Sequence, residues 1–321
     1  MFRKHTRRAA RAAFAISFGV ALLIGLTACG GGGGGGGSSN PTTTSSSGPK
    51  PAITLGTKNF GEEYILGQLY GQALAAKGFK VTYKGSFGSS ELADKAITSG
   101  KMNFYPEYTG VVALDLAKVK NAPKSATATY AAAKKFEETR GLTMLNPTPF
   151  ADTDTFTTLT STANKDGLKT MSDLKKLKSF SYAGYPECQT RITCILGMKQ
   201  IYGLKNISFI PIGSISVYTL LDQGKATGGD GFSTDPQQLQ KKKYTALVDD
   251  KHIFGFQNVA PVLKKSLLTG SNGMLLESTV NAVSAKLTLP AMQAMNKAYV
   301  VDKATAKQIA HGFLAANGLL G

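Results

Sequence analysis

The 321-residue chain is predicted to fold as an α/β protein of two lobes with a ligand cleft between them. Apolar strand-like runs alternate with segments of helical periodicity, a pattern typical of mostly parallel sheets with right-handed crossovers. This alternation is interrupted at Pro147 and Pro149 and again at Pro261, where we expect the chain to cross between lobes. Two crossings form a hinge, and a ligand would be enclosed in the cleft between the lobes.

Residues 1–28 are predicted to be a lipoprotein signal peptide. Five cationic side chains precede an apolar run over residues 12–26, which is shorter than the about 20 residues that a membrane span needs. The tetrad that ends at Cys29, Leu-Thr-Ala-Cys, resembles a bacterial lipoprotein cleavage site, so Cys29 is the expected lipidation site; an uncleaved anchor is the alternative. Residues 29–51, with eight consecutive glycines followed by Ser, Thr and Pro, are expected to form a flexible tether that reaches about 25 Å.

The formal net charge of the chain is +17, and removing the five cationic side chains of the leader leaves +12. Nucleic-acid binding would require Lys and Arg clustered with aromatic residues in one patch. The basic residues are instead mostly single lysines on helix-like segments. We therefore expect no nucleic-acid partner. We expect a solvated basic surface, which could lie near anionic lipid headgroups.

The first lobe is expected to begin with residues 52–153. We expect strands at residues 53–57, 79–84 and 142–145 and a short one in the aromatic run that Tyr108 ends, and helices at residues 62–76, 91–99 and 125–140. Pro106 cannot donate a hydrogen bond to a neighbouring strand, so we expect Tyr108 to leave the end of the strand at a point where the ladder stops. Ligands lie beyond the carboxyl ends of strands in open α/β sheets, which makes Tyr108 a candidate binding residue. A core aromatic is the alternative.

The second lobe is expected to span residues 154–258, and residues 259–321 are expected to return to the first lobe. In the second lobe we expect strands at residues 157–159, 179–183, 207–210 and 226–232, and helices at residues 172–178, 190–202 and 216–222. Three further helices, at residues 277–286, 290–300 and 303–316, are expected to complete the first lobe.

Four motifs occur in an order that resembles a known family. They are Gly56-Thr57-Lys58-Asn59-Phe60 with Glu63, Gly88-Ser89-Ser90-Glu91, Tyr105-Pro106-Glu107-Tyr108-Thr109-Gly110, and Pro186-Glu187-Cys188-Gln189-Thr190-Arg191. Together they are similar to the substrate-binding proteins of ABC importers for glycine betaine, choline and related quaternary amines. The resemblance runs from about residue 53 to about residue 320. It implies a type II periplasmic-binding-protein-like fold, with two mixed sheets flanked by helices, and partner permease and ATPase subunits.

The resemblance also implies an aromatic cage for the cationic head group. A quaternary amine cannot donate hydrogen bonds, so a protein holds it by dispersion and cation–π attraction. Matched by motif, Tyr108, Phe156, Phe232 and Phe256 stand at the four cage positions, three of them Phe where the family usually has Tyr. A drier cage of this kind would suit a bulkier or more apolar head group. The alternative is that these Phe residues are ordinary core residues.

Polar residues opposite the cage would hold a carboxylate of the ligand. Lys58 and Arg191 match family positions with this role. The alternative for Lys58 is a solvated loop lysine, and the alternative for Arg191 is an interdomain salt bridge. Val111 stands where related proteins often carry a Thr donor, so one expected donor is absent. Asp154 is a candidate contact for the cation's methyl groups; a structural role in a turn is the alternative.

Two cysteines in the mature domain, Cys188 and Cys194, are expected to form a local disulfide, because the chain carries an export signal and the two lie six residues apart. Two free buried thiols are the alternative. His252 and His311 lack ligand-like spacing to the cysteines, so we expect no metal site, and we expect no cofactor. An enzyme of the same fold is the main alternative class, but no nucleophile motif is present, so no catalytic residue is expected. A sensor or adhesin lobe that uses this fold without a transporter is the second alternative. We expect the protein to be a monomer.

The predicted lipid anchor has a direct test. Mass spectrometry of the membrane fraction should show a diacylglyceryl-modified Cys29 at the mature N-terminus. A mature chain that retains Met1 would contradict the prediction.

Overall fold

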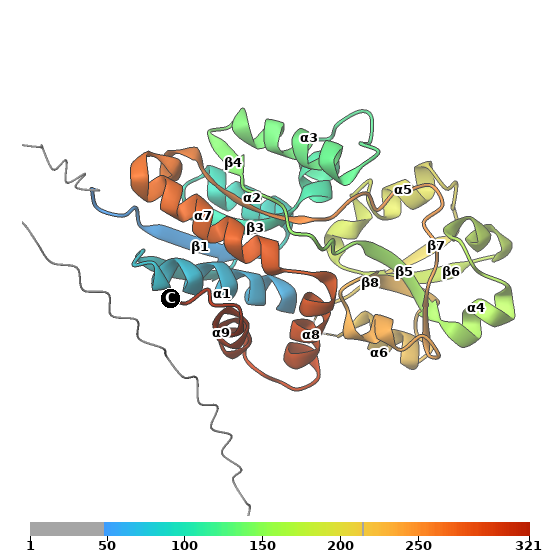
Figure 1. Cartoon of the computed structure of the whole chain (residues 1–321). Coiled ribbons are helices and arrows are strands. Elements are labelled where there is room, and N and C mark those ends of the chain that lie inside the picture. Colours follow the sequence, from blue (N-terminus) through green and yellow to red (C-terminus); the bar gives the residue numbers. More distant parts are fainter. Residues whose placement is uncertain (1–47, 214) are drawn as a thin grey trace, which may run out of the picture. The chain divides into compact units, whose positions relative to one another are not determined.

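Two five-stranded sheets organise the residues that the computed structural model describes, 48–213 and 215–321 (Figure 1). The predicted signal peptide, Cys29 and the tether up to residue 47 lie outside the described residues. Within the described ranges, no helix combines the length and the apolar character that a membrane span requires. We refer to the sheet that contains the first strand, with its helices, as lobe 1, and to the other sheet, with its helices, as lobe 2.

The sheet of lobe 1 has the strand order β2-β1-β3-β10-β4. Strands β1 and β2 are parallel, as are β1 and β3, whereas β10 runs antiparallel to both β3 and β4. The sheet is therefore mixed. The strands are β1 (Ile53–Thr57), β2 (Val81–Ser86), β3 (Phe104–Tyr108), β4 (Leu142–Met144) and β10 (Val259–Lys264).

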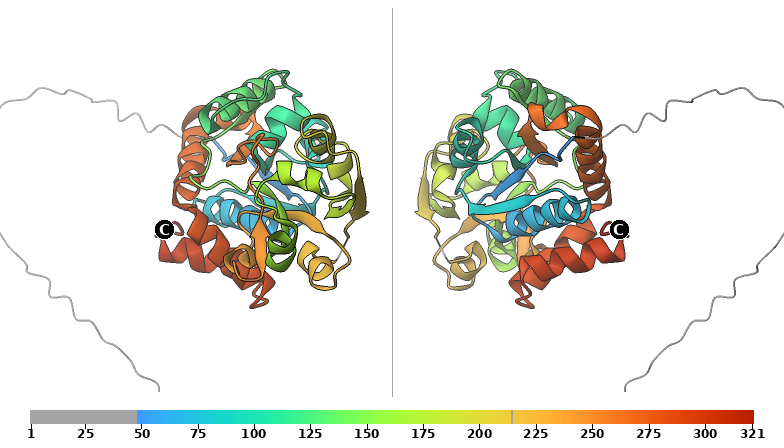
Figure 2. Two further views of the ribbon diagram at one scale, coloured as in Figure 1. Left: turned by 90° about the vertical axis from the view of Figure 1, so that its right-hand side faces the viewer. Right: turned by 90° about the vertical axis from the view of Figure 1, so that its left-hand side faces the viewer.

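Helices cover both faces of the lobe 1 sheet because successive side chains of a strand point to opposite faces. In β3, Phe104 packs into the core beneath α1, α7, α8 and α9, whereas Tyr105 packs into the core beneath α2 and α3. Figure 2 shows α3 (green) and the C-terminal helices (red) on different sides of the molecule. The helices are α1 (Gly61–Ala76), α2 (Ser90–Thr98), α3 (Ala126–Glu138), α7 (Gly270–Lys286), α8 (Leu289–Val300) and α9 (Ala306–Ala316).

The sheet of lobe 2 repeats the mixed pattern with the order β7-β6-β8-β5-β9. Strand β6 is parallel to β7 and β8, and β5 is antiparallel to β8 and β9. The strands are β5 (Asp154–Leu159), β6 (Phe180–Gly184), β7 (Ile207–Pro211), β8 (Gly228–Phe232) and β9 (Tyr244–Ala246). The helices are α4 (Thr160–Asp166), α5 (Ile195–Gln200) and α6 (Val217–Asp222).

Two chain segments connect the lobes, one leading into β5 and the other into β10. They lie side by side, because Ala151 and Asn258 form an antiparallel bridge and the Asp152 N–H donates to the Gln257 carbonyl at 3.0 Å (Figure 1). Helix α8 of lobe 1 adds a contact beside them, since the Gln293 amide donates to the carbonyl of Ser233 in lobe 2 at 3.0 Å.

Several sequence-based expectations need correction. Tyr108 is the last residue of β3, as expected, but Pro106 does not interrupt the ladder before it. Pro106 lies opposite Pro261 of β10, so the two residues that lack an N–H donor face each other. The helix expected at residues 190–202 is only α5, because a short 3₁₀ turn and the disulfide-closed loop occupy the preceding residues. Helix α7 starts earlier than expected, at Gly270, although glycine is a poor helix former; a Cβ on its Gly273 would overlap the backbone of Leu268.

Local side-chain patterns also left several elements undetected. A π-helical segment follows β3 at Val111–Leu116, and both α4 and β9 were absent from the expected elements. Helix α4 has the sequence Thr-Ser-Thr-Ala-Asn-Lys-Asp, whose residues mostly have low helix propensity. Strand β9 has only three residues, too few to establish an alternating pattern.

Gly228 leaves room for the ring of Phe156 in the core of lobe 2. Phe156 of β5 is fully buried, and a Cβ on Gly228 of the neighbouring strand β8 would overlap its ring. We expect Gly228→Ala to lower the free energy of unfolding by about 1–3 kcal/mol because it overpacks this core. Urea denaturation should show the loss. Gly312→Ala in α9 is the control: nothing lies within 4 Å of its added Cβ, so stability should rise by roughly 0.5–1 kcal/mol. Equal changes in the free energy of unfolding for the two variants would contradict this account.

Candidate ligand-binding site

A cavity of about 50 Å³ lies between the lobes and is lined by residues from both. This is room for a few water molecules, at roughly 10–15 Å³ each, so the lobes must separate further to admit a larger ligand. Five of the seven sequence-predicted binding residues line the cavity: Lys58, Tyr108, Asp154, Arg191 and Phe232. The structure also adds lining residues that the sequence did not single out, among them Phe60, Tyr185, Asp230 and Gln257.

Three aromatic rings from the two lobes lie in a row along the cavity. The ring of Phe60 is 6.2 Å from the ring of Tyr108 and 6.2 Å from the ring of Phe232, measured between centroids, with interplanar angles of 17° and 3°. Phe60 precedes the first residue of α1 in lobe 1, whereas Phe232 is the last residue of β8 in lobe 2. The row of rings therefore depends on the two lobes facing each other.

Phe156 does not line the cavity. Its ring is fully buried inside lobe 2, 5.2 Å from the Tyr182 ring centroid and 5.8 Å from that of Phe180. Asp154 and Phe156 share one face of β5, but only the beginning of the strand reaches the cleft. The motif match assigned Phe156 to the cleft, but Phe156 lies two residues beyond Asp154 along β5, inside lobe 2. Phe156 is therefore a core residue.

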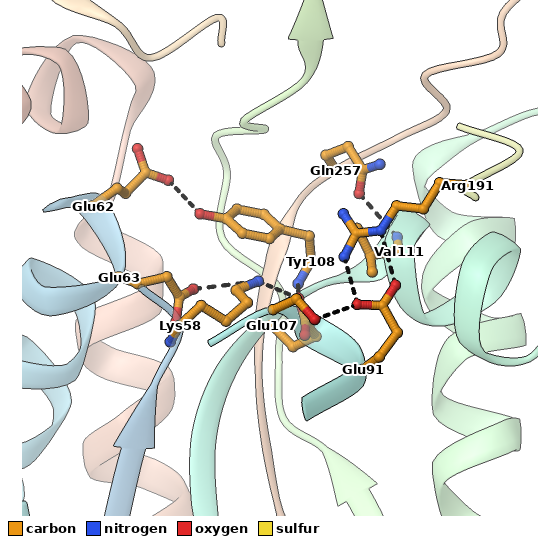
Figure 3. Close-up of polar contacts among 10 residues, drawn as sticks. Lys58, Glu62, Glu63, Glu91, Glu107, Tyr108, Val111, Arg191 and Gln257 are labelled. Atoms are coloured by element: carbon orange, nitrogen blue, oxygen red, sulfur yellow. Dashed lines mark hydrogen bonds and ion pairs between the residues drawn. The ribbon is translucent and has the colours of Figure 1, made fainter. Parts of the chain in front are cut away.

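Phe256 also lies outside the cavity between the lobes. It is partly exposed and lines a separate cavity of about 550 Å³ together with Leu114 and Phe254. Gly255 has a φ of +66°, which turns the chain before Phe256. The next side chain, Gln257, is buried at the cavity instead, and its Oε1 accepts a hydrogen bond from the Val111 N–H at 3.1 Å (Figure 3).

Lys58 is a buried lysine and not a solvated loop residue. Its ammonium forms an ion pair with Glu107 and lies 3.6 Å from a carboxylate oxygen of Glu63 (Figure 3). The same Nζ lies 3.9 Å from the ring centroid of Tyr108 and 5.7 Å from that of Phe60. A cation of the protein itself therefore already contacts the aromatic row.

Tyr108 is held from two sides by acidic residues. Its N–H donates to Glu107 at 2.7 Å, and its hydroxyl donates to Glu62 at 2.9 Å. Burial raises the pKa of Glu62, and burial also raises the pKa of Glu63 to about 8 against the opposing charge of Lys58. The ring orientation is thus fixed by hydrogen bonds and by the neighbouring Lys58.

Arg191 connects the lobes. Its Nε and Nη2 donate to the two carboxylate oxygens of Glu91, at the start of α2 in lobe 1, at 3.0 and 3.1 Å (Figure 3). Burial alone would raise the pKa of Glu91, but the hydrogen bonds and charge of Arg191 outweigh it and lower this pKa to about 2. The Thr193 hydroxyl adds a second link by donating to Asp115 at 2.7 Å. The interdomain salt bridge, considered above as an alternative, is therefore present.

Asp154 and Asp230 form an acidic wall on the lobe 2 side of the cavity. Strands β5 and β8 pair so that Asp154 lies opposite Phe232 and Phe156 lies opposite Asp230, which makes the two aspartates diagonal neighbours on one face. The Tyr182 hydroxyl donates to Asp230 at 2.9 Å. The signal for Asp230 was present in the sequence, because it precedes Phe232 by two residues in a strand and must share its face.

A disulfide joins Cys188 and Cys194 beside this wall. The two sulfur atoms and an Asp230 carboxylate oxygen lie within 4.8 Å of one another, which is close enough for metal ligands. Sulfurs joined in a disulfide are not thiolates and do not offer that ligation. The cluster is therefore a structural support for the loop that carries Arg191.

A family profile identifies the chain. The profile for OpuAC, the substrate-binding domain of ABC-type glycine betaine transport systems, matches residues 51–316. The chain belongs to this family. Substrate-binding proteins of ABC importers act outside the cytoplasm and do not convert their solute, so this extracytoplasmic binding protein is not an enzyme. The expected family and the expected absence of catalysis are both confirmed.

Individual relatives agree with this assignment. The binding protein is 28% identical over 282 residues to the glycine-betaine-binding protein of Pseudomonas aeruginosa, covering 84% of this chain and 88% of the relative. It is 26% identical over 279 residues to the glycine betaine-binding protein YehZ of Escherichia coli, covering 83% and 90%.

Solved structures share the fold. A structure of a glycine betaine/carnitine/choline ABC transporter aligns with a TM-score of 0.66 at 23% identity, covering 84% of this chain and all of the other. A choline-binding protein in complex with choline aligns with a TM-score of 0.63 at 13% identity, covering 83% and 89%. The predicted two-lobed type II fold with mixed sheets is therefore confirmed.

The interlobe ion pair gives a prediction about closure. Glu91→Gln removes one charge of the Arg191 pair, which is partly exposed and is therefore worth roughly 0.2–1 kcal/mol. We expect the variant to populate more open conformations, visible as a larger radius of gyration in small-angle X-ray scattering without ligand. Lys243→Gln is the matched control, because its partner Asp222 lies in the same lobe. An unchanged radius for Glu91→Gln would show that the pair does not hold the lobes together.

Proposed function

We propose that this binding protein captures a quaternary amine, such as glycine betaine, choline or a related compound, and delivers it to the permease and ATPase of an ABC importer. The observation that carries the proposal is the row of Phe60, Tyr108 and Phe232 along the cavity between the lobes. Each ring face offers about 0.5–2 kcal/mol to a cation that cannot donate hydrogen bonds. The names of the relatives support the same ligand class.

The contributions of the rings to binding should differ. Lys58 already covers one face of Tyr108, so we expect Phe60 and Phe232 to supply most of the contact with a bound head group. Phe60 belongs to lobe 1 and Phe232 to lobe 2, so the cage is complete only when the lobes close. Closure would also remove water from the cation and strengthen its attraction to the rings.

Anchoring would keep the protein close to the permease. We propose that Cys29 is lipidated and that the glycine-rich tether lets a monomeric binding protein reach the transporter from the outer face of the membrane. A flexible leash with a reach of about 25 Å raises the local concentration of the binding protein at its partner.

The cage is tested at Phe232. Phe232→Ala should weaken the binding of a quaternary amine by about 1–3 kcal/mol, because it removes both apolar area and a π face. Phe232→Leu keeps most of the area without the π face, so it should lose the preference for choline over its uncharged isostere, in which carbon replaces nitrogen. Isothermal titration calorimetry provides both measurements.

Two further variants test the placement of the rings. Phe256→Ala should leave binding nearly unchanged if the cage is the one described above, since Phe256 lines a different cavity. Tyr83→Ala, at an exposed aromatic residue of β2, is the surface control. Unchanged affinity for every quaternary amine in Phe232→Ala would remove the cage from this proposal.

A further inference from the structure

The charged side chains around the cavity do not suit a zwitterion. Six charged residues line it, two basic and four acidic: Lys58, Arg191, Asp152, Asp154, Glu187 and Asp230. A betaine would need at least one free cationic donor for its carboxylate. A simple cation would need acceptors and negative charge. The pairing of these six residues decides between the two.

Both basic residues are already paired with carboxylates. The Lys58 ammonium is paired with Glu107 and Glu63 inside lobe 1. The Arg191 guanidinium donates from Nε and Nη2 to the two oxygens of Glu91, which uses two of its five N–H donors. A ligand carboxylate at Arg191 would therefore share the guanidinium charge with Glu91 and weaken an ion pair that joins the lobes.

The acidic residues are not neutralised in this way. Over residues 48–213 and 215–321, none of the four acidic lining residues forms a salt bridge. Asp152 accepts hydrogen bonds from the N–H and the hydroxyl of Thr234, and Asp230 accepts one from Tyr182. The cavity thus holds carboxyl groups with which its two basic residues form no salt bridge.

Asp154 and Asp230 act as a pair. They are diagonal neighbours on one face of two adjacent strands. Burial raises the pKa of both carboxyls against the opposing charge of Arg191, and for Asp230 the neighbouring Asp154 raises it further. Like charges at neighbouring positions favour one negative charge on the pair over two, and the carboxyl oxygens offer acceptor lone pairs to the cavity.

We propose that Asp154 and Asp230 make this site selective for cations that carry a hydrogen-bond donor, of the choline kind, over zwitterionic betaines. The inference rests on the proposed function, since the aromatic row is still what holds the trimethylammonium group. The pair adds a counter-charge for the cation and an acceptor for its hydroxyl group. A betaine carboxylate at the same place would meet like charge instead.

The experiment compares choline, glycine betaine and tetramethylammonium by titration calorimetry on the wild type and on three variants. Wild type should bind choline at least tenfold more tightly than glycine betaine, and more tightly than tetramethylammonium, which lacks the hydroxyl group. Asp154→Asn and Asp230→Asn are nearly isosteric and should each weaken choline at least tenfold while leaving glycine betaine unchanged or improved. Asp302→Asn, at an exposed aspartate of lobe 1, is the control for a generic loss of charge.

The outcomes separate this inference from the proposed function. If none of the three compounds binds the wild type, the proposed ligand class itself fails. If glycine betaine binds as tightly as choline or more tightly, the ligand class stands and the selectivity is wrong. Equal losses for choline and glycine betaine in both aspartate variants would likewise overturn the role of the pair. The comparison of ligands on the wild type remains decisive even if a variant does not fold.

Discussion

The burial of the Lys58 ammonium fixes the geometry on which the site depends. Two separate segments supply its surroundings: Glu63 comes from the first turn of α1, and Glu107 and Tyr108 come from β3. A buried cation without such partners would be costly, so these segments must meet at one point. Because Glu107 also accepts the Tyr108 N–H, the same arrangement sets the backbone that carries the aromatic ring.

Most of the fold followed from periodicity in the sequence, and its exceptions have local causes. Alternating and helical patterns located the strands at residues 53–57 and 207–210 and the helix of α6 closely, because apolar side chains recur along each of them. The first turns of α7 were missed because they contain two glycines, which have low helix propensity. Tertiary packing of Gly273 against Leu268 accounts for a helix there. Propensity is a weak guide where a glycine is required by the close approach of a neighbouring backbone.

The candidate site was less predictable than the fold. Motif order placed Tyr108 and Phe232 at the cavity, but alternation alone could not show how far along β5 the cleft extends, so Phe156 was misplaced. Phe60 was part of a recognised motif, yet its contact with Phe232 spans the two lobes and has no signature in the chain. The partner of Arg191 was similarly hidden, because Glu91 lies a hundred positions away in the sequence.

The two connecting segments, which are bridged at Ala151 and Asn258, restrict how the lobes can move. A pair of strands tied by hydrogen bonds bends readily out of its own plane but resists sliding of one strand along the other. The bridge therefore favours a hinge-like swing of the lobes over a free rotation. A permease that distinguishes the open from the closed binding protein could then do so by the angle between the two lobes.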